Sequence, residues 1–319
     1  MNAARRELAL SLALGADLPV HRLGFGAMHL TGPGYWGPPT DPDEAVRVLR
    51  RAVDLGVTFI DTADSYGPDT NEQLIRQALH PYPDNLVIGT KGGMLRSGPS
   101  DWVRGGGAPY IVALGRPAYL RQQVEMSLRN LGLERIDLYQ LHRIDPAVPL
   151  VDQLGELVKL QQEGKIRHIG ISGQPAVTVD QLAQAREIAD IVAVENLYNV
   201  ADQTSEDVLR YAEEHDIAFI PWFPLGHGDL TGQGSPLAAL AGEHGATPAQ
   251  LALAWLLHRS PQILLIPGTS STGHLEDNMR AAEIKLDDRH MAAIADAVAR
   301  SKVPTWRPSA EQPAAPEPV

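Results

Sequence analysis

The chain has 319 residues, 44% of them apolar, and it carries a formal net charge of −12 at pH 7. This acidity argues against a nucleic-acid or anionic-membrane partner. Because the chain has no cysteine, disulfides, thiol catalysis and thiolate metal sites are excluded. The length alone permits one large domain or two ordinary ones.

The N-terminal stretch MNAARRELALSLALGADLP combines two arginines with a short apolar run, a pattern that resembles a signal peptide. Glu7 stands between the arginines and that run, which is atypical of such a peptide. No run of about 18 apolar residues occurs, so the sequence predicts no membrane span. We therefore expect a cytoplasmic protein.

Short β-rich runs recur along the chain and alternate with amphipathic helical segments. In the segment DEAVRVLRRAVDLG the apolar residues recur at helical spacing, and Gly56 follows as a cap. Eight strands, each followed by a helix, predict an α/β fold, a (β/α)8 TIM barrel. An open doubly wound sheet is the alternative, but GFGAMHLTG lacks the G-x-G-x-x-G spacing typical of it. The eight predicted strands are residues 22–28, 57–63, 86–91, 136–142, 166–172, 191–199, 217–225 and 263–269.

Three segments lie outside this repeat. Residues 7–20 are predicted to form an N-terminal β-hairpin that closes the bottom of the barrel. Residues 92–116 form a long Gly-rich loop at the C-terminal face, and a loop of that length in a compact domain is usually functional. The tail 303–319 carries five prolines and is expected to have little regular structure. We expect one domain over residues 1–319, with its core at about 20–300.

In a (β/α)8 barrel, polar residues at the C-terminal strand ends are typical of a catalytic site. Four residues fit this rule: Asp61, Tyr66, Lys91 and His142. Taken singly, such a lysine is usually a solvated charge and such a histidine a structural residue. Taken together, they form a proton donor: the ammonium lowers the pKa of a nearby phenol, the carboxylate keeps the ammonium charged, and the imidazole orients a carbonyl. Such a set protonates an oxygen as hydride reaches its carbon.

Five blocks of sequence resemble those of the aldo-keto reductases, in the order expected for that family. They are GVTFIDTADSYG, LVIGTKGG, IDLYQLHRID, GKIRHIGIS and IPGTSSTGHLEDN, and the match extends across residues 20–290. The chain is most similar to the bacterial branch that includes pyridoxal reductases. The resemblance implies NADPH-dependent reduction of an aldehyde or ketone. It also implies that Tyr66 is the general acid, that Lys91 and Asp61 tune it, and that His142 orients the substrate carbonyl.

The resemblance also implies a site for NADPH/NADP+, bound in an extended form across the strand ends. Trp222 occupies the place of the aromatic residue that stacks on the nicotinamide. The pyrophosphate and phosphate groups fall near Leu225, Gly226, Thr269, Ser270 and Ser271, and the adenine near Asp277 and Asn278. Spacing alone makes GTSST an ordinary helix-capping loop, and only the register with the family favours a phosphate site.

Three departures from the family pattern affect the cofactor site. The usual Ser-Asn pair after the fifth strand is Ser172-Gly173. The usual glutamine of the sixth strand is Glu195, which is expected either to face the carboxamide of the nicotinamide or to pair with a neighbouring basic residue. Gly268 stands in place of a frequent lysine and His274 in place of a frequent arginine, which weakens the grip on a 2′-phosphate, so NADH is not excluded.

Two other classes of function stay open. A metal-dependent barrel hydrolase would use His29, His142 and His227 with Asp61, but such barrels usually show a His-x-His pair, which is missing here. A non-catalytic cofactor-binding protein on the same fold is the other class. We predict no metal.

The substrate is expected to be a small-molecule carbonyl compound. The loops 29–39, 92–116 and 227–235 determine its chemistry, and His29, Trp36 and Trp102 are predicted to line the pocket. Because aromatic residues also pack loops, the sequence leaves the substrate itself open. It leaves the oligomeric state open as well.

Overall fold

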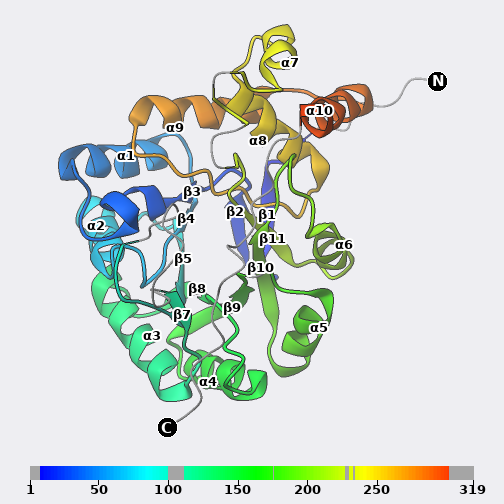
Figure 1. Ribbon diagram of the computed structural model, residues 1–319. Coiled ribbons are helices and arrows are strands. Elements are labelled where there is room, and N and C mark those ends of the chain that lie inside the picture. Colours follow the sequence, from blue (N-terminus) through cyan, green and yellow to red (C-terminus); the bar gives the residue numbers. More distant parts are fainter. Residues whose placement is uncertain (1–7, 100–110, 175, 227–229, 233, 302–319) are drawn as a thin grey trace.

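The computed structural model describes residues 8–99, 111–174, 176–226, 230–232 and 234–301. Within these ranges a parallel sheet of seven strands curls into the wall of a barrel, in the order β11-β10-β9-β8-β5-β4-β3 (Figure 1). The strands are β3 (Phe25–Gly26), β4 (Phe59–Asp61), β5 (Val87–Gly92), β8 (Ile136–Leu141), β9 (Ile166–Ser172), β10 (Ile191–Leu197) and β11 (Ala218–Trp222).

Residues 263–265 close the barrel between the two edges of this sheet. The backbone N–H of Leu264 donates to the carbonyl of Phe219 at 2.9 Å, and that of Leu265 donates to the carbonyl of Arg22 at 2.8 Å. Parallel bridges also join Phe219 to Ile263 and Leu23 to Leu265. This segment therefore holds the eighth strand position, and the predicted (β/α)8 barrel is confirmed.

Helices cover the outside of the barrel. The first begins as the sequence predicts, because Asp41 accepts from the N–H of Glu44 at 2.9 Å and caps it. Val48, Leu49 and Ala52 form its buried face. The helices are α1 (Pro42–Asp54), α2 (Thr70–Leu79), α3 (Pro117–Leu131), α4 (Leu150–Gln162), α5 (Val179–Ile188), α6 (Glu206–Glu214), α7 (Ala238–Glu243), α8 (Pro248–Arg259), α9 (Thr272–Met279) and α10 (Asp288–Ser301), with short 3₁₀ turns at Ala27–His29, Pro33–Tyr35 and Arg280–Glu283.

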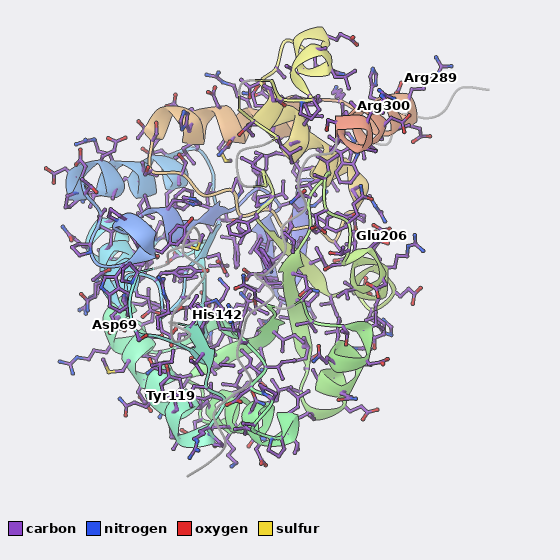
Figure 2. The ribbon with its side chains drawn as sticks, in the orientation of Figure 1. Asp69, Tyr119, His142, Glu206, Arg289 and Arg300 are labelled. Atoms are coloured by element: carbon purple, nitrogen blue, oxygen red, sulfur yellow. The ribbon has the colours of Figure 1, made fainter. Side chains whose placement is uncertain are left out.

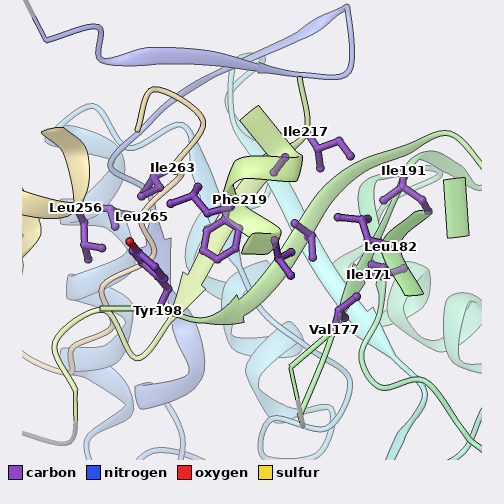
Figure 3. Packing of buried hydrophobic residues seen from close by; sticks show 14 of the residues in the cluster. Ile171, Val177, Leu182, Ile191, Tyr198, Ile217, Phe219, Leu256, Ile263 and Leu265 are labelled. Atoms are coloured by element: carbon purple, nitrogen blue, oxygen red, sulfur yellow. The ribbon is translucent and has the colours of Figure 1, made fainter. Parts of the chain in front are cut away.

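Each strand separates two apolar layers, because successive side chains point to opposite faces. On β11, Phe219 packs outward, with its ring centroid 5.6 Å from that of Tyr198, in the cluster shown in Figure 3. Its neighbours Ala218 and Ile220 belong to the cluster inside the barrel. The strands are therefore apolar on both faces, as buried parallel strands usually are.

The N-terminal hairpin is confirmed. Strands β1 (Ser11–Leu14) and β2 (Leu18–His21) pair antiparallel. Leu14 and Leu18 join the inner cluster of the barrel together with Val87 and Ala218. The hairpin therefore closes the end of the barrel at which the strands begin, and leaves the other end open for a site.

The segment 92–116 differs from its prediction as an irregular loop. Its two ends form an antiparallel ladder of β6 (Met94–Arg96) and β7 (Ile111–Ala113). The β-branched pair Ile111 and Val112 and the apolar pair Met94 and Leu95 make this pairing favourable, whereas the glycines between them dominate the sequence pattern. Residues 100–110 and the tail 303–319 lie outside the described residues. Among the helices of the described ranges, none is long and apolar enough to cross a membrane.

Candidate active site

The strand ends opposite the hairpin carry polar side chains into the barrel. Asp61 ends β4, Lys91 lies in β5, His142 follows β8 and Glu195 lies in β10. The alternation along β5 sets the direction of Lys91. Its neighbour Thr90 points outward and donates to Glu72 of α2 at 2.6 Å, so Lys91 points into the barrel. In Figure 2, His142 lies within the ring of helices, whereas Arg289 and Arg300 of α10 lie at its outer surface.

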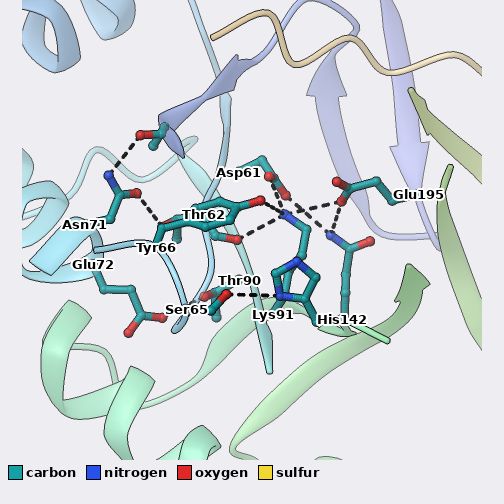
Figure 4. Close-up of polar contacts among 12 residues, drawn as sticks. Asp61, Thr62, Ser65, Tyr66, Asn71, Glu72, Thr90, Lys91, His142 and Glu195 are labelled. Carbon is teal, nitrogen blue, oxygen red and sulfur yellow. Dashed lines mark hydrogen bonds and ion pairs between the residues drawn. The ribbon is translucent and has the colours of Figure 1, made fainter. Parts of the chain in front are cut away.

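The ammonium of Lys91 is the centre of the site (Figure 4). The side chain is fully buried, and Nζ donates to Tyr66 Oη at 3.5 Å and to the carbonyl of Thr62 at 3.1 Å. It also forms a short ion pair with Asp61 Oδ2 and lies 3.3 Å from Glu195 Oε2. A buried ammonium is costly without partners, and here two carboxylates serve as its partners.

The turn after β4 holds Tyr66 against this ammonium. Thr62 Oγ1 donates to Asn71 Oδ1 at 2.7 Å, and Asn71 Nδ2 donates to the carbonyl of Ala27 at 2.9 Å. Gly67 then takes a φ of +83°, a left-handed conformation that favours glycine. The polar end of FIDTADSYG is therefore a turn that is hydrogen-bonded on both sides and places the phenol in the barrel mouth.

Gln140 of β8 connects the two carboxylates, and the sequence analysis missed it. Its Nε2 lies 3.0 Å from Glu195 Oε2 and 3.4 Å from Asp61 Oδ1. Gln140 is the direct neighbour of Lys91 across the β5–β8 pair. The amide of Gln140 between the buried residues of LYQL, two positions before His142, was the available signal.

Burial dominates the pKa values in this site. It raises the pKa of Asp61 to about 7, with a further rise from Glu195, although Lys91 opposes both. Burial alone would lower the pKa of Lys91, but Asp61 and Glu195 raise it above its ordinary value. Lys91 lowers the pKa of Tyr66 as the sequence predicts, yet burial outweighs it, so the net shift is upward. Tyr66 is therefore a neutral phenol, and Lys91 an ammonium, at neutral pH.

His142 is a neutral imidazole beside this phenol. Burial lowers its pKa well below the ordinary value, and the positive charges of Lys91, Arg143 and Arg96 lower it further. Its ring centroid lies 5.9 Å from that of Tyr66, at an interplanar angle of 83°. Its Nδ1 lies 3.4 Å from Ser65 Oγ. A neutral imidazole has one N–H to donate, which suits a carbonyl oxygen.

Tyr66 and His142 line a cavity of about 160 Å³ at the open end of the barrel. Several residues predicted to bind the cofactor line the same cavity: Ser172, Glu195, Trp222, Leu225 and Gly226. Trp222 is half-buried, and its Nε1 donates to the carbonyl of Gly173 at 3.3 Å. These residues therefore share one cavity with Tyr66 and His142.

The other predicted cofactor residues lie at and within α9, outside the lining of this cavity. Ser271 caps the helix by accepting from the N–H of His274 at 3.5 Å, and Thr269 Oγ1 accepts from the N–H of Ser271 at 3.2 Å. Ser270 and His274 are exposed, whereas Asn278 is buried. Asp277 pairs with Arg280 at 3.2 Å. The segment GTSST is thus a helix cap in this structure, and its role toward phosphate stays a prediction.

Gly268 has a steric reason to be a glycine. A Cβ at this position would lie 2.8 Å from the carbonyl oxygen of Gly26 and 2.6 Å from His29 Nδ1. Real Cβ atoms essentially never come so close to a backbone atom. The lysine that is frequent in the family at this place would therefore need the backbone to move.

The structure describes two of the three residues predicted for the substrate pocket. His29 lines the cavity. Trp36 does not belong to its lining. Its ring lies against Arg96, with 5.8 Å between the guanidinium carbon and the ring centroid. Trp102 lies outside the described residues. The lining residues that the sequence analysis missed include Tyr35, Met94, Arg96, Ile111, Arg143, Gln174 and Phe223, most of them in or next to predicted strand ends or loops.

Within the described residues, no group of three or more histidine, aspartate or glutamate side chains is arranged to hold a metal ion. His29 and His142 line the same cavity, whereas His227 lies outside the described residues.

A model of the aldo/keto reductase family matches residues 22–299. The chain belongs to this family. Pyridoxine 4-dehydrogenase of Escherichia coli is 46% identical over 288 residues, which cover 88% of this chain and 96% of that protein. An uncharacterised oxidoreductase of Schizosaccharomyces pombe is 46% identical over 278 residues, 87% of each chain. The predicted resemblance to the bacterial branch with pyridoxal reductases is confirmed.

Solved structures of aldo/keto reductases have the same fold. The glycerol dehydrogenase of Gluconobacter oxydans is 28% identical, with a TM-score of 0.80 over 94% of this chain and 98% of that one. An aldo-keto reductase of Klebsiella pneumoniae in complex with NADPH is 27% identical, with a TM-score of 0.73 over 90% of this chain and 94% of that one. The protein is therefore an NAD(P)H-dependent oxidoreductase, as the sequence predicts.

Proposed function

We propose that this aldo/keto reductase reduces an aldehyde or ketone to the alcohol with NADPH, and that Tyr66 donates the proton. The observation that carries the proposal is the contact of 3.5 Å between Tyr66 Oη and Lys91 Nζ at the wall of the cavity. NADPH, when bound, supplies the hydride. Tyr66 supplies the proton, and the ammonium of Lys91 stabilises the phenolate that remains. His142 donates a hydrogen bond that orients the carbonyl oxygen.

The residues on the cavity wall fit a nicotinamide cofactor. Trp222 offers an aromatic surface for the ring, and Ser172 offers a hydroxyl for the carboxamide. Gly26, Gly226 and Gly268 leave part of the wall without side chains, so that a ligand approaches the backbone. The loop before α9 adds the N-terminus of a helix, which suits a phosphate group.

The similarity to a pyridoxine 4-dehydrogenase makes pyridoxal the first substrate to test, beside p-nitrobenzaldehyde as a reactive aldehyde. We expect the purified protein to form the alcohol and to consume NADPH in equal amounts. If the protein binds NADPH but turns over neither these aldehydes nor a panel of sugar aldehydes and ketones, the non-catalytic alternative replaces this proposal.

The preference for NADPH over NADH should be limited by His274. Arginine carries a permanent charge and donates two parallel hydrogen bonds to a phosphate, so His274→Arg should raise the preference about tenfold. Titrations of both cofactors against tryptophan fluorescence measure it. His290→Arg changes a partly exposed histidine of α10, far along the chain from the α9 cap, and serves as the control. An unchanged ratio in His274→Arg would separate this position from the 2′-phosphate.

A further inference from the structure

The carboxylate of Glu195 is held inside the proton-donor group. Its side chain is buried, and Oε2 lies 3.3 Å from Lys91 Nζ. The same oxygen accepts from Gln140 Nε2 at 3.0 Å, and Gln140 also contacts Asp61 at 3.4 Å. Two carboxylates from strands on different sides of β5 and β8 therefore share one ammonium and one amide.

The charges around Tyr66 do not cancel. The charged groups that act on its phenol are Lys91, Asp61 and Glu195, and His142 beside it is neutral. With both carboxylates ionised, the group carries one net negative charge. The two carboxylates repel each other, and this repulsion adds to burial in raising the pKa of Asp61 to about 7.

We propose that Glu195 is a positioning residue of the proton donor: it is a second counter-ion of Lys91, and its negative charge keeps the proton on Tyr66 to higher pH. The proposal rests on the proposed role of Tyr66. It assigns Glu195 to the lysine rather than to the cofactor alone. A donor group of this charge stays protonated over a wide range of pH, which favours carbonyl reduction, whereas alcohol oxidation needs the phenolate and is favoured only at higher pH.

The expected size of the effect follows from the geometry. Lys91 Nζ lies 3.3 Å from Glu195 Oε2 and 3.5 Å from Tyr66 Oη, so the carboxylate and the phenol are within about 7 Å. At the effective dielectric constant of a protein site, one charge at this distance shifts an ionisation by about 1 to 2 pH units. Glu195→Gln removes the charge and keeps the size, and the amide oxygen still accepts from Lys91 or Gln140.

The test is a titration of Tyr66 in the cofactor-free protein. With tyrosines labelled with ¹³C at Cζ, the Tyr66→Phe variant identifies the NMR signal of Tyr66. We expect its ionisation in Glu195→Gln to begin about 1 to 2 pH units below that of the wild type. Glu195→Asp, which keeps the charge in the barrel, should stay closer to the wild type. A Tyr66 signal that titrates alike in wild type and Glu195→Gln would overturn the proposal.

Glu72→Gln is the matched control. Glu72 is also a buried glutamate beside β5, but it accepts from Thr90 on the outer face of the strand and is not among the charges that act on Tyr66. We expect no change of the Tyr66 titration in this variant. An equal shift of the Tyr66 titration in Glu72→Gln and Glu195→Gln would mean that any substitution of a buried glutamate perturbs the site. The proposed role of Glu195 would then be wrong.

Cofactor binding provides a second readout. Because the oxidised nicotinamide is a cation, loss of the negative charge should weaken NADP+ relative to NADPH by about fivefold. The pH profile of alcohol oxidation should also move to lower pH, by about 1 to 2 pH units, which is the shift expected for the Tyr66 signal. If the wild type reduces no carbonyl compound, the proposed function fails, while the titration of Tyr66 still decides whether Glu195 and Tyr66 are coupled.

Discussion

Replacing Tyr66 with phenylalanine should lower kcat for aldehyde reduction by about 10²- to 10⁴-fold, the usual contribution of a positioned general acid. Only the hydroxyl is lost, and the ring keeps its edge-on packing against His142. NADPH should still bind, because Tyr66 is not among the residues predicted to hold the cofactor, although it lines the same cavity as Trp222. Steady-state kinetics with p-nitrobenzaldehyde and a fluorescence titration with NADPH measure the two effects separately.

Tyr82→Phe is the control for this variant. Tyr82 donates its hydroxyl to the carbonyl of Leu131 at 2.6 Å, away from the cavity, so its loss should leave kcat nearly unchanged. If Tyr66→Phe keeps more than about a tenth of the wild-type kcat, another group donates the proton.

Replacing Lys91 with methionine should destabilise the folded protein by about 3–5 kcal/mol, because it removes the partner of buried charges. Lys91 is completely buried, and Asp61 and Glu195 would remain in the barrel without their ammonium. Urea unfolding measures the loss. Lys159→Met, which removes an exposed lysine paired with Glu156, should cost no more than about 1 kcal/mol. A loss below about 1 kcal/mol in Lys91→Met would mean that the site relaxes around the two carboxylates.

The same variant should change how stability depends on pH. The pKa of Asp61 is about 7 in the folded protein and about 3.9 in an unfolded chain, so the folded state binds the proton more strongly. This contribution to stability is therefore present at low pH and is lost as pH rises from about 4 to 7. Without Lys91 the pKa of Asp61 should rise further. The stability of Lys91→Met should then fall more steeply above pH 7 than that of the wild type, in which the contribution of Asp61 is already lost by about pH 7.

Local patterns were enough to predict most of the architecture. The alternation of β-rich runs with amphipathic segments predicts the barrel, since such strands bury both faces only when helices cover the sheet. The pairing of the last strand could not be predicted from such local patterns. Residues 263–265 hold the eighth position through backbone bonds to Phe219 and Arg22, and form bridges rather than a long strand. Pairing with strands far away in the chain decides this, and no local propensity contains it.

The sequence by itself determined the strands and turns that carry Asp61, Tyr66, Lys91 and His142, because each is fixed by a strand end or by the turn that follows it. Only the tertiary structure decided which inward-facing side chains touch. A period of two residues separates the inside of a barrel from the outside, but it does not state which strands meet across the interior. Closure of the barrel brings Glu195 to the ammonium of Lys91 and Gln140 to the carboxylate of Glu195, and burial there strengthens the attraction between the two charged groups.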